Sequence, residues 1–157
     1  MPNVEIQREA MSKLQFLAGT WSGAGRIWKA PDNSIEILQT EHAAFKLEGL
    51  LLTIEGAGKT KSDGRIVLQA FGLLSYDDDA GVYRMRAFND GRWLETEVVL
   101  DHSDHALHWG FRLGQISTDS PLNIDEHGDW TELHQLTMGS EPPRLLMEIA
   151  VQRDSSM

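Results

Sequence analysis

Two histidines stand among apolar residues and are the first candidates for chemistry. His42 precedes Ala43-Ala44-Phe45, and His134 follows Leu133 two residues before Leu136. Imidazole titrates near neutral pH and both donates and accepts hydrogen bonds, so a histidine in an apolar cavity can orient a ligand or transfer a proton. A histidine on the solvent side, or one satisfied by a core hydrogen bond, shows the same sequence pattern. The sequence leaves both roles open.

The run from Asp101 to His105, followed by His108, contains the residue types of a metal site. Histidines three residues apart converge on one face of a helix, but in an extended chain they alternate between faces. This run lies between two strand-like segments. The sequence therefore favours a solvated turn, and we expect no metal site.

Two glycine-rich runs have the composition of nucleotide-binding loops without their context. The run 56–60 lacks the glycine that a phosphate loop needs at Thr53, and a turn follows it in place of a helix. The run 19–25 follows a helix and opens a strand, which is the reverse of the dinucleotide-binding order. The chain also lacks Gly-x-Ser-x-Gly, His-Glu-x-x-His and cysteine. These patterns assign no catalytic residue.

Charge and composition argue against several classes of partner. The 157 residues include 14 Lys and Arg against 24 Asp and Glu, a formal net charge of −10. A surface of this sign repels phosphate backbones and anionic lipid headgroups, so we expect neither nucleic acid nor a membrane as partner. The lack of cysteine fits a reducing compartment, and the first residues do not form a signal peptide. We expect a cytoplasmic protein with no required cofactor.

One helix followed by short strands must position the candidate residues. Asn3 can cap a helix whose apolar residues recur at helical spacing, so residues 1–18 are expected to form an N-terminal helix. From residue 35 apolar and polar residues alternate, with turns such as 89–91 between the runs, while 118–129 look irregular and 154–157 are expected to fray. The pattern predicts one all-β domain over residues 1–157, a closed antiparallel up-and-down barrel of about 8 to 10 strands.

The run Gly19-Thr20-Trp21-Ser22-Gly23-Ala24-Gly25 and the late Arg153 resemble the opening and closing motifs of the calycin superfamily, the lipocalins and fatty-acid-binding proteins. The opening run is most similar to the GTWxGxG start of small bacterial lipocalin-like proteins of unknown function, and more distantly to nitrobindins. The resemblance implies a lipocalin-like pocket and a barrel floor formed by Gly19, Trp21 and Arg153. Nitrobindins bind haem through a histidine shortly before the closing arginine, where this chain has Leu145-Leu146-Met147-Glu148.

We therefore expect the barrel interior to bind a small apolar or amphipathic molecule, with no catalysis assigned. Apolar residues on alternating positions would form the walls, and a phenol and an imidazole would supply polar contacts. The expected ligand-binding residues are Tyr83, Met85, Trp109, His134, Met147 and Ile149.

Several alternatives stay open at this point. The chain is a haem protein if His42, His134 or Met147 binds iron, and an enzyme on a small hydrophobic substrate if His42 or His134 transfers protons. A barrel filled by its own side chains is a further alternative. A homodimer, with Trp28 or Trp93 as contact, is a candidate assembly.

Overall fold

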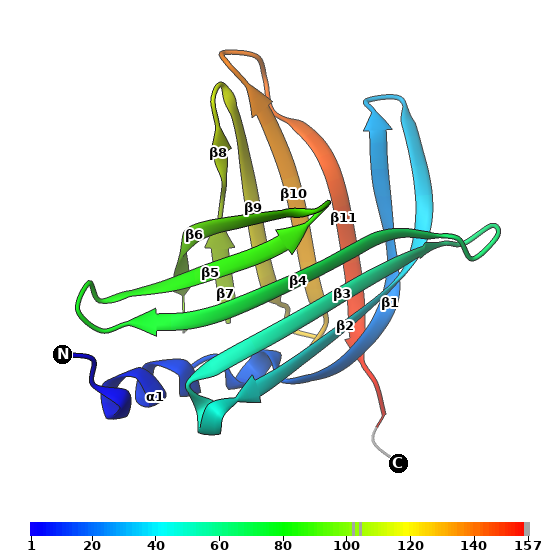
Figure 1. Cartoon of the computed structure of the whole chain (residues 1–157). Helices are drawn as coiled ribbons and strands as arrows, with labels where there is room; N and C mark the ends of the chain where they lie inside the picture. The colour runs from blue at the N-terminus through cyan, green and yellow to red at the C-terminus, as the bar shows by residue number, and fades with distance from the viewer. Residues whose placement is uncertain (102, 104, 156–157) are drawn as a thin grey trace.

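A computed structural model describes residues 1–101, 103 and 105–155 of the chain (Figure 1). The helical elements are α1 (Val4–Ser12) and two 3-10 turns, η1 (Gln15–Leu17) and η2 (Leu47–Gly49). The strands are β1 (Gly19–Ala30), β2 (Asn33–Lys46), β3 (Leu51–Thr60), β4 (Ile66–Asp77), β5 (Val82–Asn89), β6 (Arg92–Asp101), β7 (Ala106–Trp109), β8 (Arg112–Leu113), β9 (Ile116–Ile124), β10 (Trp130–Met138) and β11 (Arg144–Arg153). No helix among the described residues has the length and apolar character to cross a membrane.

The strands form a closed antiparallel barrel, as the alternation predicted. Each strand from β1 to β6 pairs with the strand that follows it, and β7 pairs with β9. The pairs β9–β10, β10–β11 and β11–β1 complete the ring. Ten strands make up this ring, and the two-residue β8 pairs with β9. The all-β fold class with a short N-terminal helix is therefore confirmed.

The expectation that residues 118–129 are irregular is wrong for their first half. Residues 116–124 form β9, which pairs with β7, β8 and β10. Thr118 and Ser120 occupy positions of this strand where an apolar residue would have revealed the alternation, and Pro121 is rare inside sheets. The period of two is present in the backbone but hidden in the residue types.

Helix α1 and the turn η1 close one end of the barrel (Figure 1). The Asn3 side chain caps the helix by accepting hydrogen bonds from the backbone N–H groups of Glu5 and Ile6, at 3.0 and 3.2 Å. The buried face of this segment consists of Ala10, Met11, Leu14 and Leu17. The Tyr83 hydroxyl donates to the Ala10 carbonyl oxygen at 2.7 Å and ties the helix to β5. The tail 154–157 is expected to fray, and its last two residues, Ser156 and Met157, lie outside the described residues.

The two ends of the chain meet at Trp21, beneath the closed end. Its ring is 1% exposed and packs edge-on against Trp130, with 5.3 Å between centroids. The indole N–H donates to the Leu17 carbonyl oxygen at 3.0 Å. The Arg153 guanidinium lies 4.2 Å from the Trp21 ring centroid and also donates to the carbonyl oxygens of Ala18 and Phe16. This contact joins the first strand, the last strand and the helical segment.

Glycines allow β1 to lie very close to β11 where the sheet closes. A Cβ added to Gly23 would overlap the Ala150 carbonyl oxygen and lie 2.7 Å from the Val151 Cα. A Cβ added to Gly25 would lie 2.7 Å from the Ile149 Cγ2. Neither side chain would fit without moving the strands apart, so these positions require glycine because of close backbone approach.

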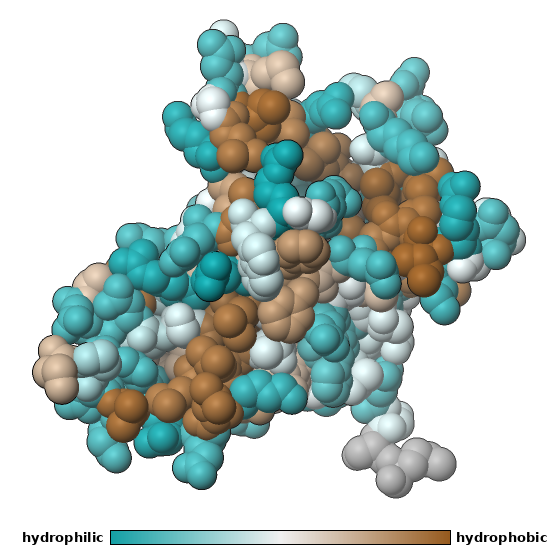
Figure 2. Space-filling view, in the orientation of Figure 1, coloured by the Kyte–Doolittle hydropathy of each residue, from teal (hydrophilic) through white to brown (hydrophobic). Residues whose placement is uncertain are grey.

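The inward-facing side chains are buried near α1 and partly exposed at the opposite end. Along β11, Val151 and Ile149 are buried while Met147 is half-buried; β10 changes in the same way from Trp130 to Leu136. Figure 2 shows apolar side chains near the upper ends of the strands, and others at the lower left in the region of α1. The inward-facing side chains are thus packed at the closed end and partly exposed at the opposite end.

We predict that Gly23→Ala lowers the free energy of unfolding by about 2 kcal/mol or more, because the new methyl group overlaps the backbone of β11. Urea unfolding measures the change. Gly72→Ala on β4 is the matched control, since its Cβ would have the Ile54 carbonyl oxygen at 3.9 Å as nearest neighbour. Equal stability of the two variants would contradict the close-approach account.

Candidate functional site

Several polar side chains lie inside the barrel, between the filled end and the open end. Among the described residues, the buried polar or charged side chains are Gln39, Glu41, Thr60 and Ser120. Glu132 and His134 face the same interior, with side chains 11% and 21% exposed. We use the name inner polar cluster for Gln39, Glu41, Ser120, Trp130, Glu132 and His134.

Four members of this cluster form a continuous chain of hydrogen bonds. The Ser120 hydroxyl lies 2.7 Å from the His134 Nδ1, and the His134 Nε2 lies 2.6 Å from the Glu132 Oε2. The Trp130 indole N–H donates to the Glu132 Oε1 at 3.1 Å. When Glu132 is ionised it accepts the Nε2 proton, which leaves the Nδ1 free to accept the Ser120 proton. This order of hydroxyl, imidazole and carboxylate is that of an activated nucleophile with its base and orienting acid.

This chain of hydrogen bonds lies at an irregularity of the sheet. Strands β9 and β10 pair at Glu132 with Leu122, and the pairing resumes at Gln135 with Asp119. The intervening Pro121 has no N–H to donate to the ladder. On the other side of β10, the register with β11 shifts between His134 and Gln135. Such local interruptions re-aim side chains, and here His134 is the side chain beside the shift.

Glu41 and Gln39 occupy space that two glycines leave free. In the register of β2 and β3, Glu41 stands opposite Gly56 and Gln39 opposite Gly58. A Cβ on Gly56 would lie 2.8 Å from the Glu41 Oε2, and a Cβ on Gly58 would lie 2.7 Å from the Gln39 Oε1. The glycine pair in run 56–60 therefore accommodates two buried polar side chains, and no nucleotide loop is present there.

Burial raises the pKa of Glu41 from 4.5 to about 9. The main cause is loss of water around its carboxyl group, and the nearby Glu132 carboxylate raises the pKa further. The Gln39 amide N–H donates to the Glu41 Oε1 at 2.9 Å and partly opposes this rise. Across the described residues, every Lys and Arg is at least partly exposed, so no buried cation neutralises the two carboxyl groups.

The Gln39 side-chain oxygen is a buried acceptor without a partner. Gln39 is 1% exposed, and its Oε1 has no hydrogen bond within the described part of the chain. A buried unsatisfied polar atom costs about 1–3 kcal/mol of stability. Such an atom in a folded protein calls for an explanation, and a bound donor is one.

The structure divides the residues expected to bind the ligand into two groups. Met85, Trp109 and Ile149 are buried at 5%, 9% and 3% exposure, and Met85 and Trp109 belong to the packed core. Tyr83 is half-buried and bonded to the helix. Met147 is half-buried and pairs in register with His134, so these two residues lie together at the open half. Their role as ligand contacts stays a prediction.

Sequence reasoning missed Gln39, Glu41, Ser120 and Glu132. A signal for the first two was present, because Gln39 and Glu41 continue the inward positions of Ile37 and Ala43 on an alternating strand. Polar residues on an apolar face, matched by glycines at the same spacing on the next strand, indicate a buried polar pair. Ser120 had no such signal because its strand was not recognised.

The other histidine candidates lie outside the interior. His42 is exposed, and its Nδ1 lies 3.0 Å from the Thr20 hydroxyl. Both ring nitrogens of His134 are engaged in hydrogen bonds, so this histidine could bind a haem iron only if one of these bonds broke. The haem hypothesis, with His42, His134 or Met147 as ligand, stays a prediction.

The structure describes only some of the candidate metal-binding residues at 101–108. His102 and Asp104 lie outside the described residues. Among the residues that are described, no group of three or more His, Asp or Glu side chains is arranged to hold a metal ion.

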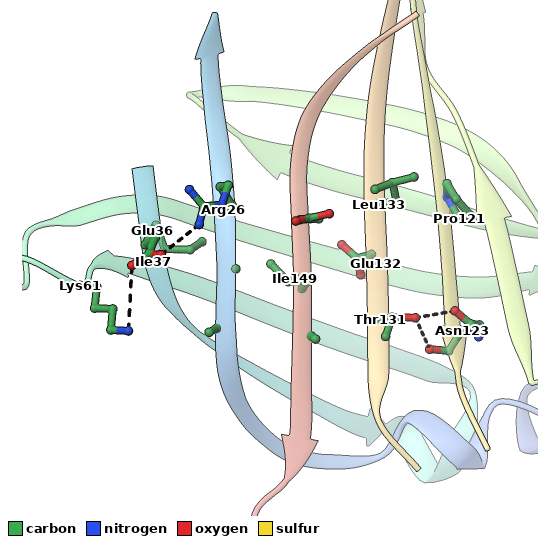
Figure 3. A pocket seen from close by; sticks show the side chains of 14 residues that line it. Arg26, Glu36, Ile37, Lys61, Pro121, Asn123, Thr131, Glu132, Leu133 and Ile149 are labelled. Atoms are coloured by element: carbon green, nitrogen blue, oxygen red, sulfur yellow. Dashed lines mark hydrogen bonds and ion pairs between the residues drawn. The ribbon is translucent and has the colours of Figure 1, made fainter. Parts of the chain in front are cut away.

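A groove of about 630 Å³ crosses the wall formed by β2, β1, β11, β10 and β9 (Figure 3). At one side Glu36 pairs with Arg26 at 2.9 Å and with Lys61 at 3.9 Å. At the other side the Thr131 hydroxyl bonds to Asn123. These polar groups pair with one another, and the groove is also lined by Glu132 of the inner polar cluster (Figure 3).

Comparison with known proteins identifies the fold and no family. No family model and no curated protein matches the sequence. The crystal structure of Rv2717c from M. tuberculosis superposes with a TM-score of 0.69 and 14% identity, over 93% of this chain and 98% of that chain. The S-type phycobiliprotein lyase CPES from Guillardia theta superposes with a TM-score of 0.66 and 7% identity, over the full length of both chains. The chain thus shares its overall fold with these two proteins.

We predict that stability falls as pH rises from about 5 to about 9, by up to about 1.4 kcal/mol per pH unit. Glu41 keeps its proton in the folded state up to a pKa of about 9, whereas the unfolded chain loses that proton near its ordinary pKa of 4.5. Urea unfolding across this pH range measures the slope. Glu41→Gln should flatten it, and Glu55→Gln, at an exposed position of β3, should leave it unchanged. An equal slope in all three proteins would contradict a buried, protonated Glu41.

Proposed function

We propose that this protein binds a small amphipathic molecule in the open half of its barrel, with the polar end of the molecule at the inner polar cluster. The observation that carries the proposal is a buried hydrogen-bonding cluster, one acceptor of which has no partner among the described residues, next to inward-facing apolar side chains that are partly exposed. Binding sites combine apolar walls with a few fixed polar groups in this way.

The filled end of the barrel limits where the molecule lies. Met11, Leu14, Leu17, Trp21 and Trp130 are at most 1% exposed and occupy the space above α1. The inward-facing residues of the open half include partly exposed apolar side chains: Ile27, Ile35, Leu68, Ala70, Ala87, Leu94, Leu136 and Met147. An alkyl or ring system on these side chains would bury apolar surface worth about 25 cal/mol per Å².

We also infer a distant relationship to the small bacterial lipocalin-like proteins, and more remotely to nitrobindins. The motif at residues 19–25, the closing Arg153 and the barrel fold support it. A cytoplasmic location and the lack of nucleic acid and membrane partners stay part of this proposal. They are supported by the absence of cysteine and by the net charge of −10.

We predict that the wild-type protein binds the neutral dye Nile red. Met147→Arg should weaken binding by about tenfold or more, because it places a charged side chain among the apolar side chains of the open half. Dye fluorescence measures the affinity. Met138→Arg is the matched control, since Met138 is exposed at the end of β10. Absence of dye binding to the wild type, or equal weakening by both substitutions, would overturn the proposal. Native mass spectrometry of the purified protein would identify a retained ligand.

A second candidate function is hydrolysis of a small ester by the Ser120–His134–Glu132 chain. The Ser120 oxygen would attack the ester carbonyl carbon while the His134 Nδ1 takes the hydroxyl proton, which then passes to the departing alcohol. A water molecule would release the acid and restore Ser120, its proton passing through His134. The hydrogen bonds of 2.7 and 2.6 Å favour this candidate.

For this second function we predict that Ser120→Ala reduces hydrolysis of p-nitrophenyl butyrate by about a hundredfold or more, because the nucleophile is lost. Absorbance of released p-nitrophenol gives the rate. Ser117→Ala changes a serine of the same strand that points to the opposite face. If Ser117→Ala and Ser120→Ala hydrolyse the ester equally, the candidate is rejected.

A further inference from the structure

We propose that the polar end of the bound molecule is a protonated amine. The interior brings the Glu41 and Glu132 carboxyl groups together with the partnerless Gln39 amide oxygen, and no Lys or Arg is buried beside them. This inference rests on the proposed binding function and names the chemical class of its ligand.

The cluster has more acceptor atoms than donors. Glu132 receives N–H groups from Trp130 and His134, at 3.1 and 2.6 Å. Glu41 receives one N–H, from Gln39 at 2.9 Å, and the Gln39 oxygen receives none. An ammonium group carries three N–H donors and no acceptor, so it supplies what Glu41 and Gln39 lack.

The charge of the cluster favours an amine over the other polar groups that an amphipathic ligand could carry. A carboxylate ligand would bring a negative charge beside the Glu132 carboxylate and the protonated Glu41, and among the described residues no buried cation offsets it. An alcohol offers one donor and no charge, so Glu41 would keep its proton. An ammonium ion would allow Glu41 to ionise beside Glu132 and would make charge-assisted hydrogen bonds, which are about twice as strong as neutral ones.

Access and long-range charge agree with this assignment. The Glu132 and His134 side chains retain 11% and 21% exposure, so the cluster meets the open half of the barrel. The alkyl chain of an amine placed here would extend past Met147 toward the open end. The net charge of −10 attracts cations at low ionic strength.

Three probes with the same twelve-carbon chain test the inference: dodecylamine, dodecanol and dodecanoate, each displacing Nile red from the intact protein below its micelle concentration. We expect dodecylamine to displace the dye at a concentration about tenfold lower than dodecanol, and dodecanoate to be the weakest. Binding of dodecanoate as tight as that of dodecylamine would overturn the amine inference while leaving the binding function intact. Failure of Nile red itself to bind would instead overturn the binding function.

Proton linkage supplies a second readout. Binding of a cation favours ionised Glu41, so dodecylamine affinity should rise between about pH 6 and about pH 9, and the complex should release a proton. The titratable groups that face Glu41 are Glu132 and, bonded to Glu132, His134. Calorimetry in two buffers of different ionisation enthalpy counts the released protons.

Glu41→Gln isolates the contribution of Glu41 to this linkage. Glutamine matches the shape of a protonated glutamate, so the variant should fold, and far-ultraviolet circular dichroism checks this. We expect the variant to lose the proton release and the preference for dodecylamine over dodecanol. Glu55→Gln should retain both, because Glu55 is exposed. A Glu41→Gln variant that keeps the amine preference would overturn the inference.

Discussion

The structure depends on closing one sheet into a ring, and the tightest part of that closure is the contact between β1 and β11. Each strand backbone has obligatory hydrogen-bonding groups, so a sheet of this size either leaves two open edges or closes. Gly23 and Gly25 let the two strands approach to a distance that no side chain would permit. Without this approach there is no interior, and the residues on the inner faces would meet solvent.

The same strand orders the floor of the barrel. Trp21, near the start of β1, lies at the closed end of the barrel. Its ring contacts Trp130 and the guanidinium of Arg153 on the last strand. Because Arg153 also bonds to the carbonyl oxygens of Phe16 and Ala18, the helical segment, the first strand and the last strand are held at one point. The helix therefore fills the closed end, and the accessible space is confined to the other half.

The buried polar side chains of this barrel depend on glycines in the neighbouring strand. Gly56 and Gly58 on β3 leave room for Glu41 and Gln39 on β2. Placing two such side chains in the interior costs stability, since one carboxyl group must keep its proton and one amide oxygen has no partner. Apolar residues at these positions would give a more stable barrel, so the buried polar side chains favour a role in ligand recognition.

The amino-acid sequence by itself determined the fold class. Period-two alternation, turn residues and one capped helix specify an antiparallel barrel with a helix, because these are local preferences that each segment expresses alone. It also placed Trp21 and Arg153 as partners, through their resemblance to known motifs. It failed at β9, where small polar residues on the inward face hide the alternation.

The site was decided by tertiary structure. Met85 and Trp109, expected as ligand contacts, are buried in the packed core, and the Trp109 ring lies edge-on to His134 at 6.1 Å between centroids. Glu41 and Glu132 come from strands that are separated by 90 residues of chain and by two intervening strands, and their mutual repulsion exists only after closure. Alternation tells which face a side chain occupies, whereas contact across a barrel depends on shear, register and closure, which no single segment encodes.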